Sequence, residues 1–196
     1  MNPWSDHLYA IVDAEASSDP VELAERALRF GCAALQLRAK RLDDRALLAM
    51  AEQLNAACKR ANVAFVVNDR PDIAALVGAD GLHLGQDDMQ IAEAREVVGA
   101  IDIGVSTHNL EQALEAERSG ADRIAFGPVF ATATKENPDP VVGLEKLGQV
   151  CRAVSRPVVA IGGITPENGT RALDHGAAQL AVISALPRFL RENQPR

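Results

Sequence analysis

The chain has 196 residues, a length that fits one domain better than two. Apolar residues make up 47% and charged residues 24%, which is ordinary for a globular protein and argues against disorder. The formal net charge of -7 disfavours nucleic acid as a partner, because a phosphate backbone needs a basic surface, but it allows a small anionic substrate.

The three cysteines, Cys32, Cys58 and Cys151, form no CxxC pair, and we interpret them as reduced packing residues of a cytoplasmic protein. The first residues lack the basic and apolar regions of a signal peptide, so none is expected. The longest apolar runs are only about six residues, far short of a membrane span. We therefore expect neither a membrane nor a nucleic-acid partner.

Short apolar runs recur along the chain, and helical patterns lie between them. The runs are nearly continuous, as strands buried on both faces should be. The predicted strands cover residues 8–12, 33–37, 64–67, 81–84, 103–106, 123–127, 157–161 and 179–184. The helices predicted from proline starts, glycine ends and apolar spacing cover residues 20–30, 43–60, 109–119 and 166–175.

Eight strands that alternate with helices fit either a closed barrel or an open doubly wound sheet. The strand count favours the barrel, and no Gly-x-Gly-x-x-Gly motif opens the first helix, which weakens a dinucleotide-binding alternative. We predict a single α/β domain, a (β/α)₈ TIM barrel, over residues 1–196 with its core at residues 8–190. The active site should then lie at the C-terminal ends of the strands.

Two cationic residues, Arg38 and Lys40, lie at the end of the second predicted strand. Alternation places Gln36, Arg38 and Lys40 on one face, and Leu37 and Ala39 on the other face, toward the helices. The polar face points into the barrel mouth, where two unpaired cations would be costly without an anion. We therefore predict anion binding here, and a structural ion pair with neighbouring carboxylates is the alternative.

Carboxylates follow the third and fourth predicted strands. Asp69 lies directly after Asn68, and Asp87 and Asp88 follow the fourth strand. Loops of adjacent strands can bring two carboxylates to one Mg²⁺, which completes its shell with water and substrate phosphate. Each aspartate could instead cap the next helix.

Later strand ends add groups that suit a second anion. Ser106 could donate to a phosphate oxygen, whereas His108 is equally well an acid–base group or a satisfied polar residue. The long 130–142 segment suits an oxyanion, with a solvated loop as the alternative. Glycines and a serine after the last two strands match the phosphate site of barrels. The loop groups are Thr132, Thr134 and Lys135, and the second anion site is built from Gly163 and Ser184, at the side of the mouth opposite the site of Gln36, Arg38 and Lys40. Two anion sites predict a two-substrate transferase.

The chain resembles the thiamine phosphate synthase family over nearly its whole length, from about Leu8 to Leu186. The segments occur in the family's order and spacing: LYAIVD, QLRAK, VVNDR, GADGLHLGQDD, GVSTH, GPVFATATK, VAIGGI and AVISA. The resemblance implies that the nitrogen of a thiazole phosphate attacks the methylene carbon of hydroxymethylpyrimidine diphosphate. Diphosphate leaves, with the carbon–oxygen bond breaking first, and thiamine phosphate forms.

The resemblance also implies roles for individual residues. The pyrimidine diphosphate would contact Gln36, Leu37, Arg38, Ala39, Lys40, Asn68, Ser106 and Lys135. Mg²⁺ would be bound by Asp69 and Asp88. The thiazole phosphate would contact Thr132, Ala133, Thr134, Gly163, Ile183 and Ser184. The catalytic contacts would come from Arg38, Lys40, Ser106 and Lys135.

The sequence departs from the family pattern in two places. Ala39 stands where an acidic residue is common, and the 130–134 loop lacks the prolines that are common beside the threonines. One alternative is a thiazole tautomerase of the same barrel family, which would not need the metal pair and could use His108. Another is a non-catalytic sensor of phosphorylated ligands, which predicts missing cations at the mouth. The oligomeric state, a homo-oligomer included, and the preferred form of the thiazole are left open.

Overall fold

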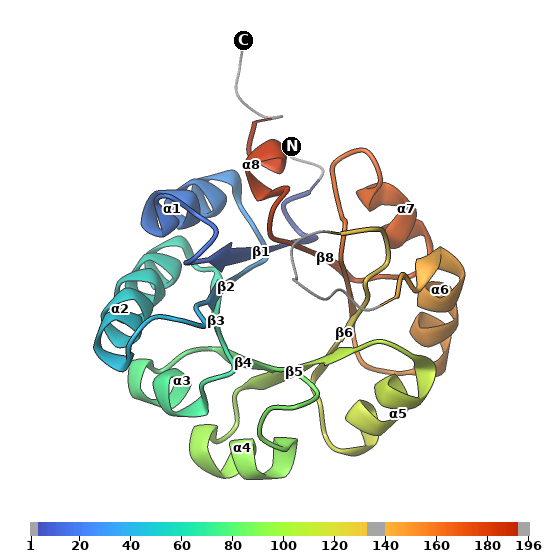
Figure 1. Ribbon diagram of the computed structural model, residues 1–196, viewed down its shortest axis with the longest axis horizontal. Coiled ribbons are helices and arrows are strands. Elements are labelled where there is room, and N and C mark those ends of the chain that lie inside the picture. Colours follow the sequence, from blue (N-terminus) through green and yellow to red (C-terminus); the bar gives the residue numbers. More distant parts are fainter. Residues whose placement is uncertain (1–3, 133–139, 192–196) are drawn as a thin grey trace.

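The computed structural model describes residues 4–132 and 140–191. Within them, eight parallel strands pair in chain order, and β1 pairs with β8, so the sheet closes into a barrel (Figure 1). The strands are β1 (Leu8–Asp13), β2 (Ala34–Arg38), β3 (Ala64–Asn68), β4 (Gly81–Leu84), β5 (Asp102–Thr107), β6 (Arg123–Phe126), β7 (Val158–Ile161) and β8 (Gln179–Val182). The predicted TIM barrel is therefore confirmed.

A helix follows each strand and lies outside the barrel (Figure 1). The helices are α1 (Pro20–Phe30), α2 (Asp44–Ala61), α3 (Pro71–Val77), α4 (Ile91–Val98), α5 (Leu110–Arg118), α6 (Gly143–Ala153), α7 (Gly169–Asp174) and α8 (Leu186–Phe189). Helix α1 has the ends that the sequence predicts. The Asp19 carboxylate accepts from the Glu22 N–H, Pro20 opens the first turn, and Gly31 closes the last turn at φ 87°.

Two predicted elements differ from the structure by two or more residues at one end. Helix α7 begins at Gly169 instead of residue 166 because Asn168 holds the preceding segment in a turn. Its side chain accepts from the Thr165 N–H at 2.8 Å and donates to the Gly163 carbonyl at 2.9 Å. Strand β8 ends at Val182, so Ile183 and Ser184 belong to the loop after it.

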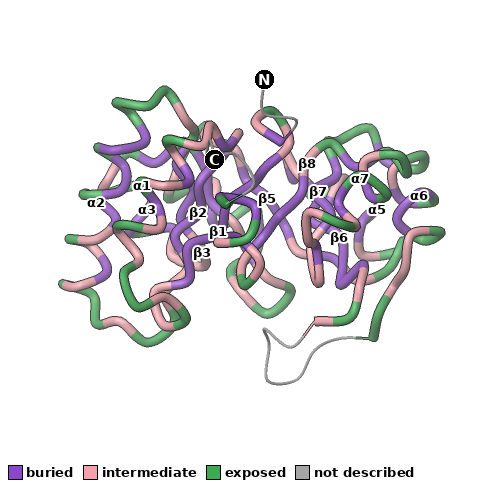
Figure 2. Tube along the Cα trace, turned by 90° about the horizontal axis from the view of Figure 1, so that it is seen from above, coloured by how far each residue is buried: buried purple, intermediate pink, exposed green. Residues whose placement is uncertain are grey.

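The apolar residues form two layers, one inside the other. The outer and larger layer lies between the strands and the helices and includes Leu35, Leu37 and Phe126. The inner layer fills the barrel itself with residues such as Tyr9 and Val159. Figure 2 shows the strands buried at the centre, while the outward turns of the helices are exposed. Within the described ranges, no helix is long and apolar enough to cross a membrane.

The ends of β6 and β7 approach each other closely at Gly127. A Cβ built on this residue would lie 2.1 Å from the carbonyl oxygen of Ile161. The Val129 N–H donates to that same carbonyl at 2.8 Å, so the contact fixes how the chain leaves β6. Glycine is needed here for close backbone approach and not for an unusual φ.

We expect Gly127→Ala to destabilise the protein by at least about 3 kcal/mol, because a methyl group against a backbone oxygen forces the strand ends apart. Gly78→Ala is the matched control. It places a side chain at φ 62° with no atom within 4 Å, so it should cost only about 1 kcal/mol. Urea unfolding followed by circular dichroism measures both values. Equal losses for the two variants would contradict this account of Gly127.

Candidate active site

A cavity of about 730 Å³ opens at the C-terminal end of the barrel. Its volume lies in the range of small-molecule sites. Every strand contributes at least one residue to its wall, and these include Tyr9, Gln36, Asn68, His83, Ser106, Ala125, Val159 and Ala181. The inner residues Ala125 of β6 and Ala181 of β8 occupy little volume and leave space within the barrel.

The two cations of β2 lie at one side of this cavity, and each has a carboxylate partner. Arg38 forms an ion pair with Asp13, the buried last residue of β1, which is its neighbour in the strand register. The Lys40 ammonium lies 2.9 Å from the Asp69 carboxylate. The expectation that these cations are unpaired is therefore wrong. Residues on one strand could not reveal it, because the partners come from the neighbouring strand β1 and from the loop after β3.

Asp13 was not among the predicted site residues, although it lies at the C-terminal end of the first strand, where a barrel active site is expected. Its second carboxylate oxygen accepts from the Glu15 and Ala16 N–H groups at 3.0 Å each. The carboxylate is thus hydrogen-bonded on both oxygens while it holds Arg38. Such satisfaction is what a buried charge requires.

Asp69 and Asp88 lie together beside Lys40. Burial raises the pKa of Asp69, and Asp88 raises it further, while Lys40 acts in the opposite direction. Asp88 also accepts from the Gly85 N–H at 2.6 Å. Asp87 lines the cavity but is not among the groups that act on Asp69. The structure thus favours Asp88 over Asp87 as the partner of Asp69.

The capping alternative for these aspartates does not fit the helices that follow them. The N-cap residues of α3 and α4 are Arg70 and Gln90, and within the described chain neither helix has a side-chain cap hydrogen bond. Asp69 instead has φ 62°, an uncommon conformation for a residue other than glycine. This conformation follows directly after the inward-facing Asn68 and places the carboxylate at the mouth.

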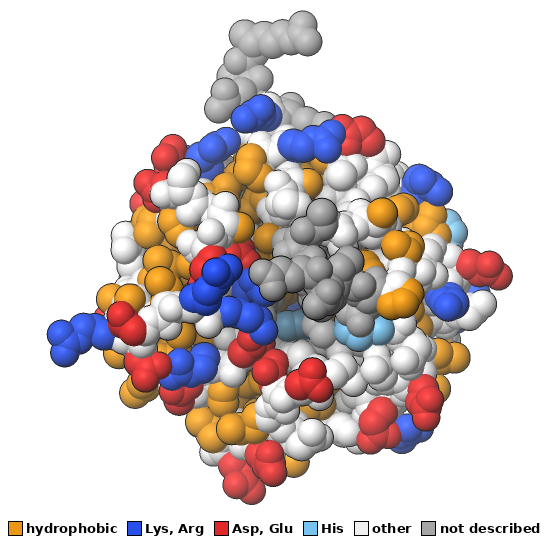
Figure 3. All heavy atoms as spheres, in the orientation of Figure 1, with side chains coloured by type: hydrophobic (Ala, Val, Ile, Leu, Met, Phe, Trp, Pro, Cys, Tyr) orange, Lys and Arg blue, Asp and Glu red, His pale blue; other side chains and the backbone are white. Residues whose placement is uncertain are grey.

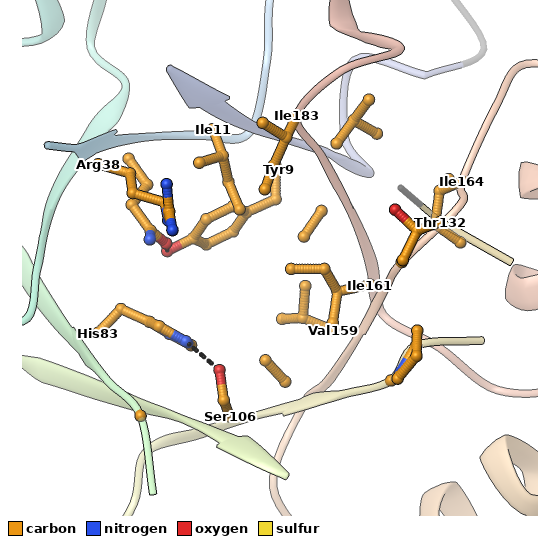
Figure 4. Close-up of a pocket in the computed structure, with 18 of the residues that line it drawn as sticks. Tyr9, Ile11, Arg38, His83, Ser106, Thr132, Val159, Ile161, Ile164 and Ile183 are labelled. Atoms are coloured by element: carbon orange, nitrogen blue, oxygen red, sulfur yellow. Dashed lines mark hydrogen bonds between the residues drawn. The ribbon is translucent and has the colours of Figure 1, made fainter. Parts of the chain in front are cut away.

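Ser106 lines the cavity from β5 and has a histidine partner. The Nε2 atom of His83 and the Ser106 Oγ are 2.8 Å apart (Figure 4). Gly104 leaves room for this ring, because a Cβ there would lie 3.0 Å from His83 Nδ1. Sequence reasoning missed His83, although alternation from Gly81 places it on the inner face of β4.

The opposite side of the mouth is built from small residues and loops. Figure 4 shows Thr132 and Ile164 across the cavity from Arg38. Gly163, at φ 64°, packs so tightly that a Cβ would lie 2.4 Å from the Ala131 carbonyl oxygen. Ile183 and Ser184 also line the cavity. Thr132 and Ile164 thus lie across the cavity from Arg38, whereas Ile183, after β8, lies beside Ile11 of β1 (Figure 4).

Several predicted residues lie elsewhere or outside the described residues. Leu37 and Ala39 pack with the outer layer and do not line the cavity, so only their backbone could contact a ligand. Ala133, Thr134 and Lys135 lie outside the described residues. His108 lines the cavity, and its Nδ1–H donates to the Gly127 carbonyl at 2.7 Å, since a carbonyl oxygen can only accept.

The face that carries the mouth has a visible charge pattern. Lys and Arg side chains gather beside Asp and Glu side chains on the side formed by β2 and β3 (Figure 3). The cysteines take no part in it. Burial raises the pKa of the Cys32 and Cys58 thiols to about 12, which suits packing residues and not nucleophiles.

Comparison with known proteins identifies the family. A family model for thiamine monophosphate synthase matches residues 8–186. The chain is 48% identical over 183 residues to the thiamine-phosphate synthase of Methanocella arvoryzae, covering 91% of this chain and 86% of that protein. It is 43% identical over 188 residues to the thiamine-phosphate synthase of Chlorobium luteolum, covering 95% of this chain and 88% of that protein.

Solved structures agree with these sequence matches. Thiamine phosphate pyrophosphorylase from Pyrococcus furiosus superposes with a TM-score of 0.84 at 34% identity, covering 96% of this chain and 97% of that chain. An N-acetylmannosamine-6-phosphate 2-epimerase from Clostridium perfringens, at 16% identity and a TM-score of 0.71, shares the fold alone. The chain belongs to the thiamine monophosphate synthase family.

Proposed function

We propose that this protein joins hydroxymethylpyrimidine diphosphate to a thiazole phosphate, forming thiamine phosphate and releasing diphosphate. The observation that carries the proposal is one cavity with two unlike sides. Arg38, Lys40 and a pair of carboxylates line one side, Thr132 and Gly163 line the other, and Ser184 lines the wall after β8. Such a cavity suits two anionic substrates held face to face. The relatives named above are synthases, so neither the tautomerase nor the sensor gains support from them.

The pyrimidine substrate belongs on the side of β2, β3 and β4. Its diphosphate would contact Arg38 and Lys40, whose charges match it, and its ring would lie deeper, near Gln36, Asn68 and Ser106. The thiazole phosphate would lie across the mouth, near Thr132, Gly163 and Ser184. The methylene carbon and the thiazole nitrogen then face each other in the middle of the cavity. Placing two reactants in contact in this way supplies much of the rate acceleration of a bimolecular reaction.

The reaction needs no nucleophile from the protein. The carbon–oxygen bond breaks with its electron pair going to diphosphate, and the thiazole nitrogen supplies the electron pair of the new carbon–nitrogen bond. Negative charge grows on the diphosphate as it leaves, and Arg38 and Lys40 are already positioned to stabilise it. Groups that stabilise charge only as it develops raise kcat more than they lower KM.

The residues present fit a Mg²⁺ ion. Asp69 and Asp88 lie together, burial opposes the charge of Asp69, and Mg²⁺ takes one or two protein carboxylates with water and phosphate as further ligands. The described residues contain no group of three or more His, Cys, Asp or Glu side chains that could hold a metal, so substrate oxygens would complete the shell. A bound Mg²⁺ would help to neutralise the diphosphate. The cytoplasmic location that we propose fits the described cysteines, which are free thiols.

The metal proposal separates two neighbouring aspartates. Asp88→Asn should lower activity by about 100-fold at fixed Mg²⁺, because the amide keeps an acceptor for the Gly85 N–H but loses the charge that attracts the cation. Asp87→Asn is the matched control and should stay within about five-fold of wild type. Thiamine phosphate and diphosphate are assayed together, with and without excess chelator. Equal damage from the two variants, or equal turnover in chelator, would remove the metal assignment.

Lys40→Met tests whether charge at the diphosphate acts on the chemical step. The change keeps most of the stem and removes the ammonium, so we expect kcat to fall by about 100-fold with a smaller change in KM. The loss of stability should be at most about 1 kcal/mol, because the Lys40 side chain is 53% exposed beside Asp69. The exposed Lys59, on α2, provides the control Lys59→Met. If kcat of the Lys40 variant stays within a few-fold of wild type, Lys40 is only an ion-pair partner.

Ser184→Ala tests the opposite side of the mouth. We expect KM for the thiazole phosphate to rise by about ten-fold and KM for the pyrimidine diphosphate to change little, since one hydrogen bond to a charged group is lost. Ser155→Ala removes an exposed hydroxyl that bonds Glu117 far from the cavity, and it should change neither value. Gly163→Val is a poorer test, because its side chain would also displace Ala131. A rise in the pyrimidine KM alone would mean that the two substrate sites must be exchanged.

A further inference from the structure

Three side chains on consecutive strands form a hydrogen-bonded chain across the floor of the cavity. The Tyr9 hydroxyl donates to Gln36 Oε1 at 2.9 Å, and Gln36 Nε2 donates to Asn68 Oδ1 at 2.8 Å. Tyr9 and Gln36 are 4% and 2% exposed, so water does not compete for these bonds. Figure 4 shows the Tyr9 ring lying across the cavity floor with its hydroxyl toward the side of Arg38.

The direction of this chain decides which atoms face the cavity. An amide oxygen can only accept and an amide nitrogen can only donate. Because Gln36 Oε1 accepts from Tyr9, Gln36 Nε2 lies on the side of Asn68. The Asn68 side chain must then accept from Nε2 through its Oδ1. The Asn68 amide nitrogen is then left to face the other way. Reversing the first bond would reverse both amides and present an acceptor where a donor now stands.

An ion pair between Arg123 and Asp102 also acts on the Tyr9 phenol. The guanidinium of Arg123 and the carboxylate of Asp102 are the charged groups that act on the phenol. Arg123 is fixed by Asp102 at 2.8 Å and by Gln179 at 2.6 Å. Arg123 and Asp102 act on the phenol in opposite senses, so the direction of the bond follows from Gln36 Oε1, which can only accept. Burial also raises the pKa of Tyr9, so the hydroxyl keeps its proton across the working pH range.

We propose that Tyr9 is a positioning residue, whose hydroxyl sets the orientation of the Gln36 and Asn68 amides so that Asn68 presents N–H donors to the pyrimidine diphosphate. The inference rests on the proposed placement of that substrate beside Gln36 and Asn68. Tyr9 acts through the other two side chains and supplies no catalytic group. Its effect is therefore on the polarity of the floor, and the thiazole side should not sense it.

Tyr9→Phe tests the proposal, because it keeps the ring and removes only the hydroxyl. We expect KM for the pyrimidine diphosphate to rise by about 5- to 20-fold, the size of one hydrogen bond lost with an amide left free to turn. KM for the thiazole phosphate should stay within about two-fold. Asn55→Ala is the control for a merely structural effect. It removes a buried amide that bonds the Val77 carbonyl outside the cavity, so it should lower the melting temperature without changing either KM.

A double-mutant cycle with Gln36→Met shows whether Tyr9 acts through Gln36. If it does, Tyr9→Phe should change the pyrimidine KM by less than about two-fold once Gln36 is replaced. Two outcomes would overturn the proposal about Tyr9 without affecting the proposed function. In the first, the changes in pyrimidine KM caused by the two substitutions multiply in the double variant. In the second, Tyr9→Phe leaves the pyrimidine KM unchanged although Gln36→Met raises it. If Gln36→Met itself leaves the pyrimidine KM unchanged, the placement of the substrate fails and the proposal fails with it.

Discussion

Every inward-pointing side chain of the barrel shares one interior, because eight parallel strands close on themselves. The interior is closed at its N-terminal end by polar residues that begin strands, where Arg123 bonds both Asp102 and Gln179. Closer to the mouth, the inner layer contains small residues such as Ala125 and Ala181. The space that they leave is the cavity. Closure thus determines both where the protein is filled and where it is hollow, and each functional side chain reaches the site by its position along a strand.

Arg38 and Lys40 at the mouth each form an ion pair with a carboxylate of the protein, but the two carboxylates differ in how firmly they are held. Arg38 pairs with a buried carboxylate that is also bonded to backbone N–H groups, so its position is fixed by the fold. Lys40 pairs with Asp69, which also lies beside Asp88. A cation bound by the two aspartates would compete with Lys40 for Asp69 and free the ammonium for an anion. For an anionic substrate bound as proposed, Arg38 would be a fixed contact and Lys40 an adjustable one.

The fold was predictable from the sequence because its signals are local: apolar runs mark all eight strands, and alternation places Gln36, Arg38 and Lys40 on the inner face. The errors arose where a contact joins segments distant in the chain. The pairing of Arg38 with Asp13 depends on strand register, and the late start of α7 depends on Asn168 bonding back to Gly163. Neither is visible in a pattern of residue types. His83 is different, since alternation alone would have placed it inside the barrel.

The two sides of the cavity differ in how they are built, and this affects what substitutions there can reveal. On the β2–β4 side, side chains such as Gln36 and Lys40 extend from regular strands, so they can be changed without moving the backbone. On the β6–β8 side, Gly127 and Gly163 let backbone segments touch, and a single methyl group would collide with a carbonyl oxygen. If the two substrates bind as proposed, recognition on the first side depends on side chains, whereas on the second side it depends on the path of the backbone. Substitutions of the first kind report on chemistry, and glycine substitutions of the second kind report first on folding.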